Sequence, residues 1–92
     1  MGTAAPTPLA AQDNHAKRLS SIVGVAVEEY AKAFDDRGRL IAPLEYEETT
    51  SFLGDARQVA GRLTGYDAPR TRAVLDTMIS AVAAKVPPAQ IR

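Results

Sequence analysis

Three stretches of this 92-residue chain repeat apolar residues every three or four positions, and glycine or proline stands at the junctions between them. Residues at this spacing fall on one face of an α-helix, and a globular protein buries that face. The pattern therefore predicts an all-α fold. Because the connections are short, we expect a small antiparallel three-helix bundle. The expected helices cover residues 14–34, 43–63 and 68–86.

The ends of these helices follow from residues that start or stop them. Asp13 or Asn14 is expected to cap the first helix by accepting a backbone N–H. Pro43 suits the first position of the second helix, because its φ is fixed and it has no N–H to satisfy. Gly38 is expected at a positive φ in the turn after the first helix. The pair Pro87-Pro88 stops the third helix.

The opening of the chain differs in composition from the rest. Residues 1–13 are rich in Ala, Pro and Thr and show no apolar period, so we expect a disordered tail or linker ahead of one helical domain, 14–92. This opening has neither the basic start nor the apolar run of a complete signal peptide. No apolar stretch approaches the roughly 18–20 residues that cross a bilayer, so no transmembrane segment is expected.

The expected core is light. Tyr30 and Leu53 lie at the centres of their apolar stripes, whereas Glu28 points away from the core. The chain has only five Phe and Tyr residues and no Trp, so much of its apolar content is Ala and Val. Such a core often gains stability from a partner, so a homodimer is one expectation. Gly24 costs about 1 kcal/mol against Ala within a helix, which predicts close packing of another helix there.

The charges balance overall but are unevenly distributed. The formal net charge is zero, which argues against a nucleic-acid partner, because phosphate binding needs a basic excess. Residues 28–55 hold eight acids and three bases, whereas residues 56–92 hold two acids and six bases. The two regions can pair within the fold, or the first can present an acidic surface to a cation.

Catalytic arrangements are missing from the sequence. The chain has no cysteine, its one histidine is His15, and no serine has a histidine placed to activate it. The six glycines are scattered and form no phosphate-binding loop. We therefore expect a protein that is not an enzyme.

The turn between the first two helices resembles part of a calcium-binding loop. With Gly38 at the sixth loop position, Asp35 stands at the third. Ala33 and Leu44 then occupy the first and twelfth positions, which need oxygen ligands, and Arg37 takes another ligand position. The segment is therefore interpreted as a structural turn.

Two glutamates early in the second helix form the one candidate metal site. Glu45 and Glu48 are three positions apart and so are neighbours on one flank of the helix. Two carboxylates can begin a site for a hard cation such as iron, manganese or magnesium, and Glu29 lies at the edge of the first helix's apolar face, within reach. The alternative is that these acids only complement the dipole at the helix N-terminus.

Three segments together resemble a known family: Glu29–Ile41, Glu45–Glu48 and Phe52–Arg57. They combine a Tyr-bearing helix, an Asp/Gly turn ending in an aliphatic pair, and a Glu-Tyr acidic helix ending in Ala-Arg. This pattern is similar to the extracytoplasmic helical accessory domain of bacterial high-affinity iron permeases, over roughly residues 19–63. The resemblance implies a periplasmic or extracytoplasmic, non-catalytic domain for iron uptake, associated with the membrane through its parent protein. The partners it implies are the permease membrane domain and a cytochrome c module.

The chain departs from the family's other signatures. The permease motif Arg-Glu-x-x-Glu lies on membrane helices, whereas Leu44 precedes Glu45 here, so that membrane role does not carry over. No Cys-x-x-Cys-His motif is present to attach a haem. Two interpretations stay open: an iron-uptake accessory domain that binds iron through carboxylates or docks on the permease, and a structural or protein-interaction module with no metal role.

Overall fold

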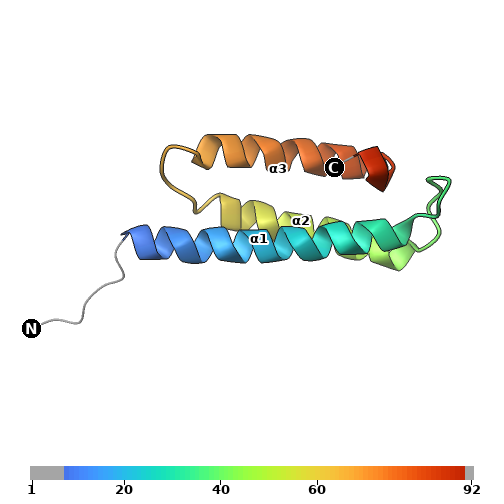
Figure 1. Ribbon diagram of the computed structural model, residues 1–92, viewed down its shortest axis with the longest axis horizontal. Helices are drawn as coiled ribbons and strands as arrows, with labels where there is room; N and C mark the ends of the chain where they lie inside the picture. The colour runs from blue at the N-terminus through green and yellow to red at the C-terminus, as the bar shows by residue number, and fades with distance from the viewer. Residues whose placement is uncertain (1–7, 91–92) are drawn as a thin grey trace, which may run out of the picture.

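The computed structural model describes residues 8–90, which form three helices and a short C-terminal turn (Figure 1). The elements, in chain order, are α1 Pro8–Ala33, α2 Pro43–Ala60, α3 Ala68–Ala83 and the 3₁₀ turn η1 Pro88–Gln90. Consecutive helices are antiparallel, so α1 and α3 run in the same direction and both pack on α2. The predicted all-α three-helix bundle is therefore confirmed. No helix in this part of the chain is both long and apolar enough to cross a membrane.

Small aliphatic side chains dominate the core, as expected. Tyr30 is 3% exposed and Leu53 is 2% exposed, which confirms both as central residues, and Glu28 is exposed. The buried apolar set is Leu19, Ala26, Tyr30, Ala33, Phe34, Leu53, Ala56, Val59, Ala60, Leu63, Ala68, Leu75 and Val82. Five of these thirteen residues are alanines, so the helices approach closely but bury little area per residue.

The start of α1 differs from the prediction. The helix begins at Pro8, so positions 13 and 14 lie inside it and the predicted N-cap at Asp13 or Asn14 is wrong. Pro8 explains the earlier start, because proline favours the first position of a helix. The prediction relied instead on N-cap residues, which are a different kind of start signal. Residues 8–13 of the expected tail are therefore helical, and its remaining residues lie outside the described part of the chain.

The two other helices end earlier than predicted, α2 at Ala60 and α3 at Ala83. After Ala60 the backbone hydrogen bonds join residues three apart, as in a 3₁₀ turn. Leu63 lies in this turn and is buried. After Ala83 the chain leaves the helix through Lys85, which has a φ of +57°. The Lys85 and Val86 N–H groups donate to the carbonyls of Val82 and Ala81, the C-terminal motif that glycine usually provides.

Long-range hydrogen bonds fix α3 against α2 and α1. The Tyr30 hydroxyl donates to the Val86 carbonyl at 2.5 Å, and the Tyr46 hydroxyl donates to the Val82 carbonyl at 2.8 Å. At the opposite end, Arg72 Nη1 donates to the carbonyls of Ala60 and Leu63, at 3.1 and 3.2 Å. These carbonyls belong to the last turn of α2 and the residues just after it, so a side chain of α3 satisfies acceptors that α2 leaves open.

The turn between α1 and α2 has the predicted structural role. Gly38 has a φ of +77°, as expected. Asp35 Oδ1 accepts the backbone N–H groups of Arg37 and Arg39, each at 2.9 Å, and Asp35 Oδ2 accepts from Arg39 Nε at 2.9 Å. These hydrogen bonds, above all the one from the Arg39 backbone, lower the pKa of Asp35 below its ordinary 3.8. The Asp35 carboxylate therefore stabilises the turn through these hydrogen bonds.

Candidate functional site

The predicted acidic residues meet at the junction of α1 and α2. Glu29, on α1, has a side chain that is 17% exposed, and its carboxyl lies beside that of Glu48 on α2. A hydrogen bond with Glu29, partial desolvation, and repulsion by Glu29 and then Glu45 raise the pKa of Glu48 above its ordinary 4.5. Lys32 Nζ lies 3.4 Å from Glu29 Oε1 and opposes this shift.

The arrangement gives a cation two close carboxylates but no third ligand in place. Glu45 is half-buried and influences Glu48 through repulsion. Among the residues whose side chains are described, 14–90, no three His, Cys, Asp or Glu side chains converge as metal ligands do. His15, in the first half of α1, is half-buried. The geometry therefore brings Glu29 and Glu48 together and keeps a lysine beside them.

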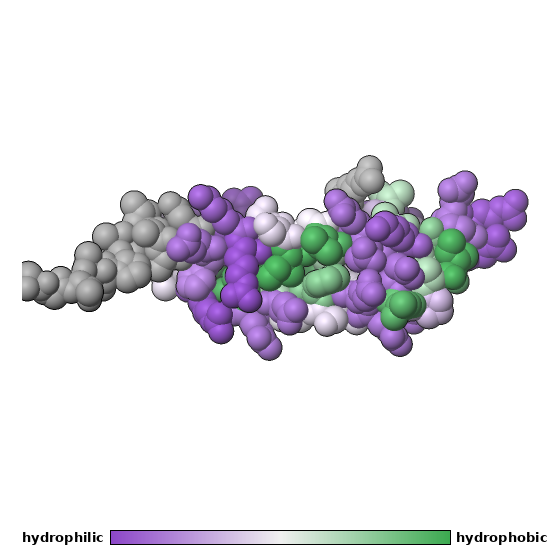
Figure 2. Space-filling view, turned by 90° about the horizontal axis from the view of Figure 1, so that it is seen from below, coloured by the Kyte–Doolittle hydropathy of each residue, from purple (hydrophilic) through white to green (hydrophobic). Residues whose placement is uncertain are grey.

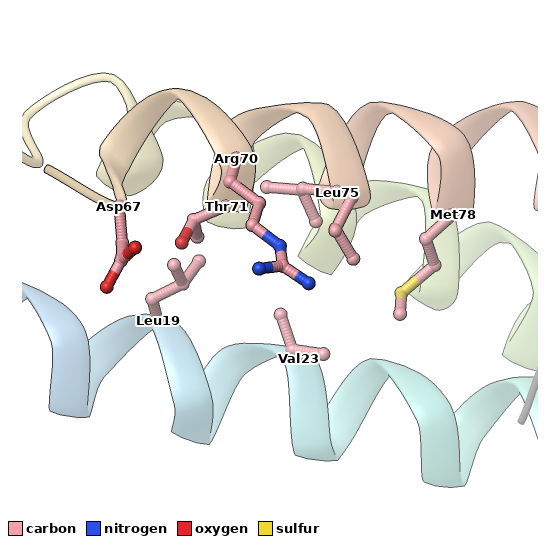
Figure 3. A pocket seen from close by; sticks show the side chains of 8 residues that line it. Leu19, Val23, Asp67, Arg70, Thr71, Leu75 and Met78 are labelled. Carbon is pink, nitrogen blue, oxygen red and sulfur yellow. The ribbon is translucent and has the colours of Figure 1, made fainter.

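A second candidate site, which the sequence analysis did not predict, lies between α1 and α3. No Cα atom of α1 comes within 8 Å of a Cα atom of α3 in the described chain, although both helices pack on α2. The space between them is a groove of about 440 Å³ (Figure 3). Its lining is Leu19, Val23, Asp67, Arg70, Thr71, Val74, Leu75 and Met78. Figure 3 shows the Arg70 guanidinium reaching from α3 across the groove toward Val23 on α1.

This α1–α3 groove continues toward the C-terminal ends of both helices. A second hollow shares Met78 with the first and adds Val27, Tyr30 and Ala31 of α1 and Val82 of α3. Apolar side chains along it remain accessible, since Val27 is 42% exposed and Val74 is 58% exposed. Figure 2 shows the side of the molecule opposite α3, where hydrophobic side chains also lie on the surface between hydrophilic ones.

The α1 wall of the groove is uncharged. Its small residues Val23, Val27 and Ala31 alternate with the larger Leu19 and Tyr30. A neighbouring hollow that shares Leu19 and Val23 with the groove adds Ala16 and Ser20. Near them, a Cβ added to Gly24 would meet no atom of another helix within 4 Å. The prediction that another helix of this chain packs closely on Gly24 is therefore wrong.

The groove was missed because apolar periodicity identifies the buried face of a helix but not how much of that face its neighbours cover. One signal was available: besides the buried Ala26, Tyr30 and Ala33, α1 carries the apolar residue Val27 on a neighbouring part of its surface. A stripe that wide can serve two neighbours. In this chain α2 covers one part of it, and α3 stands too far away to cover the rest.

Comparison of the chain with protein-family models, curated proteins and solved structures finds no match to any of them.

Proposed function

We propose that this chain is a non-catalytic accessory domain of an iron-uptake permease system, located outside the cytoplasm and held at the membrane by its parent protein. The resemblance over roughly residues 19–63 supports both the assignment to an iron-uptake permease system and the location outside the cytoplasm. The observation that carries a role in handling iron is the pairing of Glu29 and Glu48 across two helices. Carboxylate oxygens are the ligands that hard divalent cations prefer.

The chemistry of the pair predicts weak, reversible binding, with iron as cargo. A cation between Glu29 and Glu48 would relieve the repulsion that contributes to the raised pKa of Glu48. Lys32 would have to leave Glu29, since its ammonium competes for the same oxygens. Two carboxylates leave most positions around the metal to water, which favours fast exchange over storage.

Calorimetric titration at neutral pH, with Mn²⁺ and with Fe²⁺ under anaerobic conditions, tests this proposal. We expect a weak binding heat for the wild type that disappears in a Glu45→Gln/Glu48→Gln variant, which keeps side-chain size and removes charge. Glu47→Gln is the matched control, because Glu47 is an exposed acid of the same helix outside the pair. Equal heats for wild type and the double variant, or no heat for either, would eliminate the metal role.

The second candidate function is a protein-interaction module without a metal role, favoured by the open apolar groove between α1 and α3. Soluble domains rarely leave a continuous apolar groove uncovered unless something binds there. The permease membrane domain and a cytochrome c module are the partners implied by the resemblance, and a second copy of the chain is the third.

A further inference from the structure

We propose that the α1–α3 groove is the interface between two copies of this chain, which pair antiparallel about a two-fold axis near the middle of the groove. This inference deepens the interaction-module candidate by naming its partner, and it does not depend on the metal proposal. It rests on the shape of the groove and on the distribution of charge along the bundle.

The shape of the groove suits a helix of the same kind as its walls. The α1 wall is uncharged and includes the small residues Val23, Val27 and Ala31, so a second α1 can approach at the 8–10 Å typical of packed helices. In a two-fold dimer, α1 of each copy would cover the groove of the other, and the exposed Val27 and Val74 of both copies would be buried. The interface would be self-complementary, because the same surface faces itself.

Charge selects a second copy and fixes its direction. The end of the bundle that contains residues 14–24 and 52–76 carries six bases and three acids, a net charge of +3. The end that contains residues 25–51 and 77–90 carries seven acids and four bases, a net charge of −3. Antiparallel pairing places each basic half beside an acidic half, whereas parallel pairing would bring like charges together.

Arg70 lies where this complementarity would act. It belongs to the basic half and its guanidinium extends over the groove, as Figure 3 shows. In the antiparallel arrangement it would face the acidic half of the other copy. The net negative charge of that half favours a positive side chain at the edge of the groove, and the groove lining there is uncharged.

Sedimentation equilibrium of the chain over a range of concentrations tests for the dimer. We expect the mass to rise from the 9.8 kDa of the monomer toward twice that value, with weaker association as ionic strength increases. Val27→Arg should raise the dimer dissociation constant by about tenfold or more, because a charge would be buried without a partner. Val74→Glu should act in the same direction from the other wall of the groove, because the new carboxylate would face the acidic half of the other copy.

Val25→Arg is the matched control for Val27→Arg. Val25 lies on the same helix and is 41% exposed, nearly the same as Val27, but does not line the groove. It should leave the dissociation constant unchanged, while circular dichroism verifies that each variant is folded. A wild type that stays monomeric throughout, or equal effects of Val25→Arg and Val27→Arg, would overturn the proposal.

Disulfide cross-linking tests the direction of pairing, because the chain has no native cysteine to interfere. Ser20→Cys and Ala31→Cys place single thiols on the groove side of α1, on either side of its midpoint. An equimolar mixture of the two variants should form the mixed dimer in preference to either homodimer. Preferential cross-linking of each variant to itself, or no cross-linking at all, would contradict the antiparallel arrangement.

Discussion

Replacing Tyr30 or Tyr46 by phenylalanine removes one of two hydroxyls that hold the C-terminal end of α3, and the two changes should differ in cost. Tyr30 donates to Val86 and Tyr46 donates to Val82. Burial first, and then repulsion from Tyr46, raise the pKa of Tyr30 above its ordinary 10.0, so its hydroxyl remains a donor at neutral pH. Each substitution removes one oxygen atom and leaves the aromatic packing in place.

The magnitudes depend on what each carbonyl retains. Val82 keeps the backbone N–H of Lys85 at 3.0 Å, so Tyr46→Phe should cost about 0.5–1 kcal/mol, the net value of one hydrogen bond. Within residues 8–90 the Tyr30 hydroxyl is the one donor that reaches the Val86 carbonyl. Tyr30→Phe leaves that half-buried acceptor unpaired and should cost about 1–2 kcal/mol.

Urea unfolding followed by circular dichroism measures these differences. Thermal unfolding should show a decrease in Tm of about 5–10 °C for Tyr30→Phe in a domain of this size. Tyr66→Phe is the control, because Tyr66 is 99% exposed, and it should change the free energy of unfolding by less than about 0.3 kcal/mol. If Tyr46→Phe proved as costly as Tyr30→Phe, or if Tyr66→Phe matched either, the reasoning from carbonyl partners would be refuted.

Two further predictions concern packing and titration. Leu53→Ala should reduce the free energy of unfolding by about 2–4 kcal/mol and Glu28→Ala by less than about 0.5 kcal/mol, and a larger loss for Glu28→Ala would contradict the burial of α1. Because the folded protein raises the pKa of Glu48 above 4.5, it binds that proton more tightly than the unfolded chain does. The stability of the wild type should therefore fall relative to Glu48→Gln as pH rises above about 4.5, as urea unfolding from pH 4 to 7 would show; parallel profiles would exclude the Glu29–Glu48 interaction.

Most of the fold could be predicted because the residues that start and stop the helices agree with the apolar pattern that marks their buried faces. The positive φ of Gly38 and the place of Pro43 at the start of α2 follow from constraints within single residues. The end of α3 could not be predicted in the same way. Lys85 adopts the left-handed conformation that favours glycine, and Val86 continues the apolar period after the helix has ended.

The candidate sites likewise combine features that the sequence predicts with features that it does not. Helical spacing predicted that Glu29 would approach the glutamates of α2, and Glu48 is the one whose pKa it raises. That Glu45 affects the pair only through repulsion depends on side-chain positions that spacing does not specify. The groove depends on the distance between α1 and α3, which are not neighbours in the sequence, so the wide apolar surface of α1 does not by itself determine it.

The central place of α2 also has a consequence for how the molecule opens. Both helix–helix interfaces join elements that follow each other in the chain, an arrangement of low contact order that favours rapid folding. α2 packs more extensively on α1 than on α3, so the α1–α2 hairpin should be the more persistent unit in hydrogen exchange, with α3 opening at lower free energy. The α1 wall of the groove is then rigid and the α3 wall is compliant. The groove can therefore widen to admit a helix while the α1–α2 hairpin stays folded.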